Sequence, residues 1–276
     1  MEVLSENKSF GGRQLVIRHP SKSTGCDMTF ALFLPEGEGP FPVVWYLSGL
    51  TCSHANVMEK GEYRRVAAEL GVAVICPDTS PRGEGLPGFD PSDWQMGQGA
   101  GFYVDATEAP YADNYQMYTY VTAELPELVF AEYPLDAGRQ SVFGHSMGGH
   151  GALVCALRNP ERYKSCSAFA PIVQPSTADW SKRALGEYLG ADESKWRAWD
   201  SVALIEDGAR FPELLVDQGE ADGFLNDGLR PWLLADACKA AGIDLTLRMQ
   251  PGYDHSYFFI SSFMEDHLRW HAQRLN

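Results

Sequence analysis

A serine lies in the middle of the pentapeptide Gly144-His145-Ser146-Met147-Gly148, which has the pattern Gly-x-Ser-x-Gly. Residues 140–143 predict the end of a buried strand before it, and residues 147–157 predict a helix after it. A serine on such a sharp strand-to-helix turn, a nucleophile elbow, presents its hydroxyl at a helix N-terminus, where N–H groups favour a developing oxyanion. Side chains at either glycine would collide with the adjoining strand or helix. The pattern predicts that Ser146 is a catalytic nucleophile; the alternative is a small-residue turn that only packs tightly.

An acid that completes a Ser-His-Asp triad is expected after a strand that follows the serine in the chain. Residues 213–217 predict that strand, and two aspartates compete for the role. Asp217 belongs to the strand end and is expected to hold local backbone N–H groups, whereas Asp222 lies beyond the turn at Gly219 and can point towards a histidine. We therefore favour Asp222, with Asp217 as the alternative. Either aspartate could instead cap a helix or a turn.

His255 follows the last predicted strand, residues 244–249, at the place where the general base belongs. The other histidines of the chain fit this place less well. His145 is expected to point away from the site, at the second position of the pentapeptide. The rest precede the serine, lie in the helix after it, or lie on the terminal helix: His19, His54, His150, His267 and His271.

Two backbone N–H groups are expected to bind the oxyanion that forms when the serine attacks a carbonyl. One belongs to Met147, the residue after the nucleophile. The other comes from the loop Ser48-Gly49-Leu50 after an early strand, with Leu50 as the favoured donor. Gly49 lets the backbone of this loop approach a substrate carbonyl, and each donor can stabilise the transition state by about 3 kcal/mol.

The elements that must position these residues alternate between strands and helices. Strands are predicted at residues 13–19, 28–34, 43–47, 72–76, 165–170, 213–217 and 244–249. Helices are predicted at residues 56–70, 111–133, 147–157, 227–241 and 256–274, with short helices within 174–207. The first two strands alternate in hydrophobicity, whereas residues 43–47 are apolar throughout, as in a strand covered on both faces. The predicted fold is one α/β domain over residues 1–276, with a mostly parallel sheet, N-terminal antiparallel strands and helices on both faces.

Residues 78–110 contain many glycines and prolines and show little periodicity. A stretch of this length inside a compact domain is either wrongly assigned or functional. Because it follows the carboxyl end of a predicted parallel strand, where α/β proteins build their binding sites, we expect it to form part of the site.

The net charge of −15 excludes several classes of partner. Without a basic tract, the chain is not expected to bind nucleic acid or an anionic membrane. No apolar run approaches membrane-spanning length, and the polar residues 1–8 lack the apolar core of a signal peptide. Six cysteines without a Cys-x-x-Cys pair indicate free thiols in a cytoplasmic protein rather than a metal site or disulfides.

Along nearly its whole length, the chain resembles the S-formylglutathione hydrolase (esterase D) family of the α/β-hydrolases. The resemblance rests on residues 47–52, 77–83, 99–107, 144–153, 217–219 with Asp222, and 252–256. Many esterases share the pentapeptide, but residues 77–83 and 99–107 are far more specific.

The resemblance implies a serine thioesterase that hydrolyses S-formylglutathione to formate and glutathione in formaldehyde detoxification, with activity on short-chain acyl esters. It also implies frequent homodimers, and the expected chemistry needs no metal or organic cofactor. Because a formyl group is tiny, Trp94 and Trp180 are expected to narrow the acyl pocket. The alternatives are a carboxylesterase or acyltransferase that acts on oxygen esters, and a non-catalytic binding protein with this fold.

Two further expectations concern the surroundings of the reacting groups. Glutathione conjugates are negatively charged, so Lys60, Arg82 or Lys182 could supply a local positive charge, although each also suits a solvated surface. Cys52 follows the oxyanion loop closely, and bulky thiol reagents on it are expected to obstruct the site. The alternative for Cys52 is a small buried apolar side chain.

Overall fold

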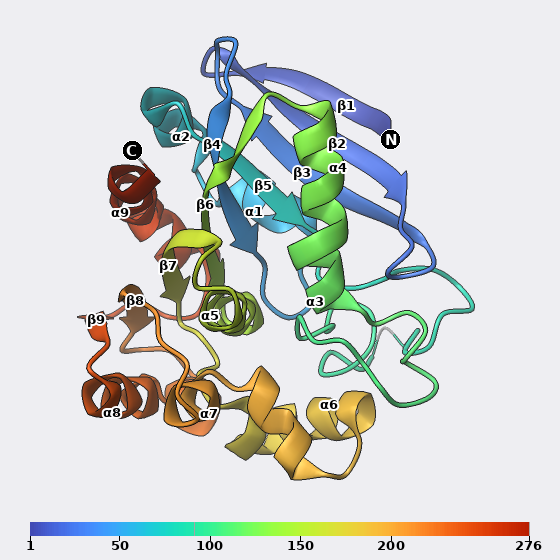
Figure 1. The fold of residues 1–276 in the computed structure, drawn as a ribbon, viewed down its shortest axis with the longest axis vertical. Coiled ribbons are helices and arrows are strands. Elements are labelled where there is room, and N and C mark those ends of the chain that lie inside the picture. The colour runs from blue at the N-terminus through green and yellow to red at the C-terminus, as the bar shows by residue number, and fades with distance from the viewer. Residues whose placement is uncertain (91, 276) are drawn as a thin grey trace.

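In the computed structural model, which describes residues 1–90 and 92–275, nine strands form one sheet (Figure 1). The strands are β1 (Glu2–Ser9), β2 (Gly12–Pro20), β3 (Asp27–Leu34), β4 (Phe41–Leu47), β5 (Ala73–Pro77), β6 (Leu135–His145), β7 (Tyr163–Phe169), β8 (Glu213–Gly219) and β9 (Asp244–Gln250). Their spatial order is β1-β2-β3-β5-β4-β6-β7-β8-β9.

The sheet is antiparallel at its N-terminal edge and parallel elsewhere. Strands β1, β2 and β3 are antiparallel to their neighbours, and β3 is antiparallel to β5. From β5 through β4 and β6 to β9, all neighbours are parallel. This confirms the predicted sheet. Strand β1 was not predicted, because its residues are almost all exposed and it pairs with β2 alone.

Helices cover both faces of the sheet. The main helices are α1 (His54–Lys60), α2 (Arg64–Leu70), α4 (Leu125–Glu132), α5 (Met147–Arg158), α7 (Ser201–Glu206), α8 (Pro231–Ala241) and α9 (Tyr257–Leu275). Helices α1 and α2 pack against α9 on one face, whereas α4 and α5 lie on the other, where α7 contacts both α5 and α8 (Figure 1). None of the described helices is long and apolar enough to cross a membrane.

Two predicted helices are divided in the structure. The segment 56–70 forms α1 and α2, because α1 ends at Gly61 and Glu62 adopts a positive φ of 56°. The segment 111–133 becomes helical only at Met117, with α3 (Met117–Thr119), a π-helical turn at Tyr120–Glu124, and then α4.

The late start of α3 has a local cause. The carbonyl of Tyr115 accepts the N–H of Ala106, and the N–H of Met117 donates to Val104, so this stretch pairs with the preceding loop instead of continuing a helix. The helix predicted at residues 227–241 is interrupted at Arg230: Leu225–Leu229 form a π-helical turn, Arg230 adopts the αL conformation, and α8 starts at Pro231.

Two irregular segments lie beyond the carboxyl ends of the parallel strands (Figure 1). One is the stretch between β5 and α3, which contains an isolated bridge between Asp105 and Gln116. The other contains a 3₁₀ turn at Pro175–Thr177, α6 (Asp179–Leu189) and a 3₁₀ helix at Glu193–Trp199, and it leads into α7. Short helices were predicted for this second segment.

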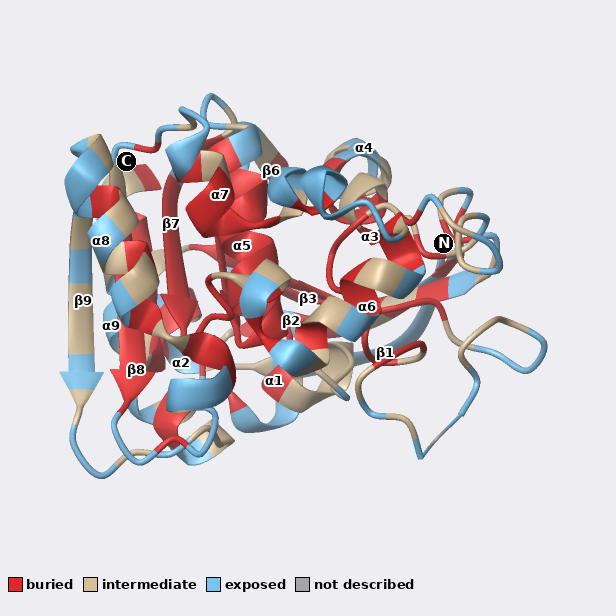
Figure 2. Cartoon of the chain, turned by 90° about the horizontal axis from the view of Figure 1, so that it is seen from below, coloured by how far each residue is buried: buried red, intermediate tan, exposed pale blue. Residues whose placement is uncertain are grey.

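The core surrounds the central strands and α5 (Figure 2). Strand β4 is buried throughout, as its continuous apolar sequence predicts. All residues of α5 from Met147 to Leu157 are buried as well. The turn between β6 and α5 is therefore held by rigid elements on both sides.

Candidate active site

Ser146 lies on the turn between β6 and α5 with a strained backbone, at φ 58° and ψ −117°. Its N–H donates to the carbonyl of Phe169 at 2.9 Å. A Cβ on Gly144 would lie 2.6 Å from the carbonyl oxygen of Leu47, and one on Gly148 would collide with the same peptide group. The two glycines thus allow β4, β6 and α5 to approach closely enough for the elbow to form.

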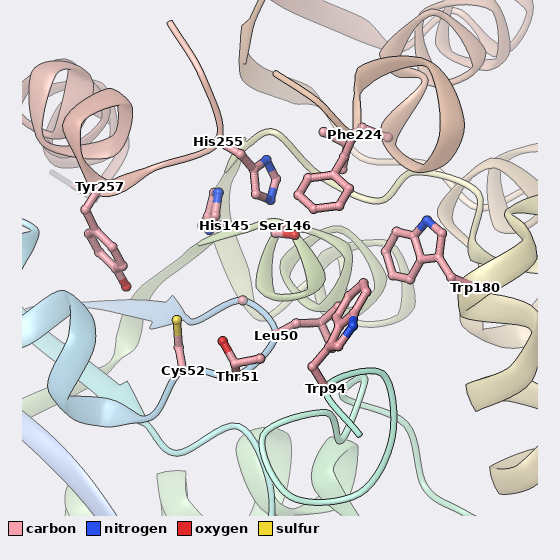
Figure 3. Close-up of a pocket in the computed structure, with 12 residues that line it drawn as sticks. Leu50, Thr51, Cys52, Trp94, His145, Ser146, Trp180, Phe224, His255 and Tyr257 are labelled. Atoms are coloured by element: carbon pink, nitrogen blue, oxygen red, sulfur yellow. The ribbon is translucent and has the colours of Figure 1, made fainter. Parts of the chain in front are cut away.

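His255 and Asp222 form a hydrogen-bonded pair beside this serine. Nδ1 of His255 lies 2.5 Å from Oδ2 of Asp222, and Figure 3 shows the His255 ring next to Ser146. The buried Asp222 carboxylate also accepts the N–H of Phe224 at 2.8 Å and Nε2 of Gln218 at 3.1 Å. These donors fix the carboxylate so that it can orient the imidazole and stabilise a positive charge on it.

Asp217, the alternative acid, has different partners. It is fully buried and accepts two hydrogen bonds from Arg248, at 2.7 and 2.5 Å, and one from Gln250 at 3.0 Å. Nε2 of His267 lies 3.0 Å from its Oδ2. Although burial alone would raise the pKa of this carboxyl, hydrogen bonds from His267 and Arg248 outweigh burial and lower the pKa to about 2. The structure therefore brings Asp222, and not Asp217, to His255.

The loop after β4 lies directly against the elbow. A Cβ on Gly49 would stand 3.2 Å from Cβ of Ser146, so a larger residue would press on the serine. The N–H of Leu50 has no acceptor among the described residues. The N–H of Met147 is the first of α5 and has no acceptor within the helix. Both N–H groups are available to a ligand, and their role in binding an oxyanion stays a prediction.

The long segment after β5 supports both parts of this arrangement. The hydroxyl of Tyr103 donates to the carbonyl of Ser48 at 2.9 Å, and the N–H of Thr51 donates to Gly99 at 2.9 Å. The ring of Tyr103 also packs on Gly151 of α5, where a Cβ would lie 2.5 Å from the ring. The segment was expected to form part of the site, and it fixes the loop after β4 against the elbow helix.

Ser146 opens into a cavity of about 270 Å³ (Figure 3). Its lining consists of Gly49, Leu50, Thr51, Cys52, Trp94, His145, Ser146, Trp180, Phe224, Leu229, His255 and Tyr257. The structure thus brings Cys52, Trp94 and Trp180 together with the reacting groups, and the two tryptophan rings lie 6.2 Å apart. Phe224, Leu229 and Tyr257 were not predicted from the sequence, since only their position two to seven residues after Asp222 or His255 could have indicated them.

The expectation that His145 points away from the site is wrong. Its ring lines the cavity, and its centroid lies 4.4 Å from that of His255. The physical reason is Gly49, which leaves room for the ring: a Cβ there would stand 3.1 Å from Nδ1 of His145. Burial, and then the proximity of His255, keep the pKa of His145 well below its usual value, so the ring is neutral.

The three side chains considered as cations for the negative charge of glutathione are poorly placed to bind a ligand in the cavity. Arg82 donates to both carboxylate oxygens of Asp78 at 3.0 Å and to the carbonyl of Cys52 at 2.8 Å, so its charge is already paired. Lys60 lies in the last turn of α1, and Lys182 lies in α6. Neither lysine is among the described residues that line the cavity.

Comparisons with known proteins give a consistent result. The family model that matches residues 21–270 is described as "Putative esterase". The S-formylglutathione hydrolase of Paracoccus denitrificans is 56% identical over 276 residues, covering 99% of this chain and 98% of the relative. That of Mus musculus is 50% identical over 281 residues, covering 100% of this chain and 99% of the relative.

A solved structure matches equally well. The chain superposes on an S-formylglutathione hydrolase from Agrobacterium tumefaciens with a TM-score of 0.98 at 62% identity, and the match covers 100% of both chains. Together with the order of the strands, this likeness confirms the α/β-hydrolase fold expected from the sequence.

Proposed function

The chain belongs to the S-formylglutathione hydrolase family of esterases, and we propose that it hydrolyses S-formylglutathione to formate and glutathione through a formyl-Ser146 intermediate. One observation supports this mechanism above all others. The His255–Asp222 pair stands beside a serine on a strained elbow, and the free N–H of Leu50 lies on the adjoining loop. Such an arrangement suits acyl transfer by a serine nucleophile.

In the first step, His255 accepts the Ser146 proton as the serine oxygen attacks the thioester carbon. Asp222 orients the imidazole and stabilises the imidazolium that forms. The oxyanion accepts hydrogen bonds from the N–H groups of Leu50 and Met147, each worth about 3 kcal/mol in the transition state. The C–S bond then breaks, and the glutathione sulfur leaves with the proton from His255.

In the second step, water attacks the formyl-serine. His255 accepts a proton from the water, the same two N–H groups bind the second oxyanion, and the serine oxygen leaves with the proton. Formic acid and free Ser146 result, and the acid releases its proton to solvent to give formate. No step requires a group outside the chain other than substrate and water.

The cavity suits a small acyl group on a larger leaving group. Trp94 and Trp180 stand next to each other in its wall, and Trp94 remains 43% exposed at the rim. We propose that these rings, together with Cys52, limit the size of the acyl chain. Short-chain oxygen esters such as acetates would then be secondary substrates.

Steady-state hydrolysis of S-formylglutathione beside p-nitrophenyl acetate tests the proposal. We expect a large preference in kcat/KM for the formyl thioester, and loss of both activities in Ser146→Ala. Ser167→Ala is the matched control, because Ser167 is a fully buried serine. Equal or better turnover of the acetate would leave the serine mechanism standing but refute the substrate assignment.

We also propose that the protein is a cytoplasmic homodimer. All six cysteines are free, and Cys26 and Cys52 are partly accessible, which suits a reducing compartment. The side chain of Phe258, 85% exposed, is a candidate for the dimer contact. Sedimentation equilibrium of wild type and Phe258→Ser would test the oligomer, and a monomer at micromolar concentration would contradict it. Cell fractionation would test the compartment.

A further inference from the structure

The ring of His255 lies between two other rings (Figure 3). The centroid of His145 stands 4.4 Å away at an interplanar angle of 47°, and that of Phe224 stands 5.1 Å away at 66°, edge to face. The only hydrogen bond recorded for the His255 ring among the described residues is the one to Asp222. That bond fixes one ring nitrogen, but the ring can still tilt around it. The two flanking rings restrict that tilt.

Each flanking ring comes from the segment that carries another member of the pocket. His145 directly precedes Ser146 at the end of β6. Phe224 follows Asp222 by two residues, and its N–H donates to Oδ1 of Asp222 at 2.8 Å. The position of the histidine ring is therefore tied to both the nucleophile segment and the acid segment.

The two flanking rings, of His145 and Phe224, have different surroundings. His145 is buried, wedged between His255 and Gly49 of the loop after β4, and neutral. A neutral ring here adds no second positive charge beside an imidazolium on His255. Phe224 is 41% exposed and packs edge to face against His255, whose side chain is 20% exposed. One flank thus connects the histidine to the oxyanion loop, and the other connects it to the loop that carries Asp222.

We propose that His145 and Phe224 are positioning residues that hold His255 at the angle needed to exchange a proton with Ser146. This inference rests on the proposed function, because it assigns His255 the role of general base. Misplacing a reacting group by about 1 Å can cost on the order of 100-fold in rate. Loss of either ring should therefore lower kcat and leave KM nearly unchanged.

Phe224 offers the cleaner experiment, since it is half-exposed and its backbone, not its side chain, holds Asp222. We expect Phe224→Ala to lower kcat for p-nitrophenyl acetate by about 10- to 100-fold. Phe224→Tyr should stay within about threefold of wild type, since it keeps the ring. Trp232→Ala is the matched control: it removes an equally exposed aromatic on α8 that is not among the described residues lining the cavity, and it should leave kcat and KM unchanged.

His145 requires a pair of variants, because its site is tight. His145→Ala should lower kcat to a similar degree, whereas His145→Phe, which keeps a neutral ring, should recover most of it. In parallel, proton NMR can follow the low-field resonance of the His255–Asp222 hydrogen bond. We expect this resonance to broaden or disappear through exchange in Phe224→Ala and to persist in Trp232→Ala.

Any one of three results for Phe224→Ala would overturn the proposal. These results are a kcat within twofold of wild type, a change confined to KM, and an unaltered low-field resonance. Because the acetate assay needs only the serine mechanism, failure of the glutathione assignment would be visible separately, as poor turnover of S-formylglutathione by the wild type. Failure of the serine mechanism would show as full activity in Ser146→Ala.

Discussion

The serine, histidine and aspartate at the cavity have a counterpart buried between α9 and the sheet. We call Ser146, His255 and Asp222 the pocket set, and Ser167, His267 and Asp217 the sealed set. In the sealed set, Oγ of Ser167 lies 2.8 Å from Nδ1 of His267, whose Nε2 lies 3.0 Å from Asp217. All three have no exposed surface. The two sets share residue types and a hydrogen-bonded histidine–aspartate pair, and they differ in surroundings.

The difference lies in access and in backbone geometry. Ser146 stands on an elbow with positive φ beside a cavity and a free N–H donor, whereas Ser167 lies within the regular strand β7. The Ser167 hydroxyl also contacts Nε2 of His271 at 2.8 Å, and the charge of Asp217 is paired with Arg248. Residue types alone therefore do not make an active site; substrate access and unpaired oxyanion donors are needed as well.

The largest expected contrast concerns the two serines. Ser146→Ala removes the proposed nucleophile and should lower kcat for p-nitrophenyl acetate by about 10⁵-fold or more. Ser167→Ala leaves His267 without one partner and should lower the free energy of unfolding by about 1–3 kcal/mol, with kcat within a few-fold of wild type. Assays and urea unfolding of both variants measure this. A loss of kcat above 100-fold in folded Ser167→Ala would show that the sealed set takes part in turnover.

Substitutions of the two aspartates should likewise differ, one acting on kcat and the other on stability. Asp222→Asn removes the acceptor that orients His255, and we expect kcat to fall by about 10³- to 10⁴-fold with little loss of stability. Asp217→Asn removes one of the two carboxylates that pair with Arg248 and leaves only the exposed Asp266. Because the Arg248 side chain is about one-third exposed, we expect a cost of only about 2–3 kcal/mol, measured by urea unfolding. Reversed effects, with Asp217→Asn inactive and stable, would restore Asp217 as the acid.

Some parts of the pocket could be predicted from the sequence, because their backbone conformation is set by neighbouring residues in the chain. The pentapeptide 144–148 carries its own glycines, and the placement of Asp222 beyond Gly219 follows from the end of a strand. The order of these segments in the sequence was therefore enough to predict which residues lie at the pocket. Their chemical roles remain predictions that the variants above would test.

The directions of side chains were harder to predict. His145 turns into the pocket because Gly49, about one hundred residues earlier in the chain, leaves space for it, and Phe224 lies on a loop whose course depends on Asp222. Strand β1 carries no hydrophobic alternation, since it is an exposed edge held to β2 by backbone pairing. Such features arise from contacts distant in sequence, which periodicity does not record.

A smaller effect on the free energy of unfolding should follow from a change in pH. Burial lowers the pKa of His267 in the folded protein, so the unfolded chain takes up this proton at higher pH. The neutral ring stabilises the fold fully above the unfolded pKa of about 6.5, and this contribution is lost as the pH falls towards the folded pKa. Within that window, the free energy of unfolding should fall by up to about 1.4 kcal/mol per pH unit from His267.

Urea unfolding of wild type and His267→Gln at pH 7, 6 and 5 checks this prediction. The variant should be less stable at pH 7 but should lose less stability on acidification. Asp217 acts at lower pH, since its pKa of about 2 means that its contribution is complete above about pH 4 and is lost between there and pH 2. Parallel stability curves for the two proteins would exclude His267 as a source of acid sensitivity.

The smallest expected effect concerns the cysteine nearest each set. Cys52 lines the cavity, whereas Cys166, next to Ser167, is fully buried. Burial raises the pKa of both thiols, so the reaction of Cys52 with a bulky maleimide should be slow at pH 7 and faster at pH 9, and Cys166 should stay unmodified.

Modified Cys52 should obstruct the cavity and reduce turnover severalfold, whereas Cys52→Ala should be insensitive. Mass spectrometry identifies the labelled thiol. Inhibition of Cys52→Ala equal to that of wild type would refute obstruction at Cys52, and labelling of Cys166 in the folded protein would show that the sealed region opens to solvent.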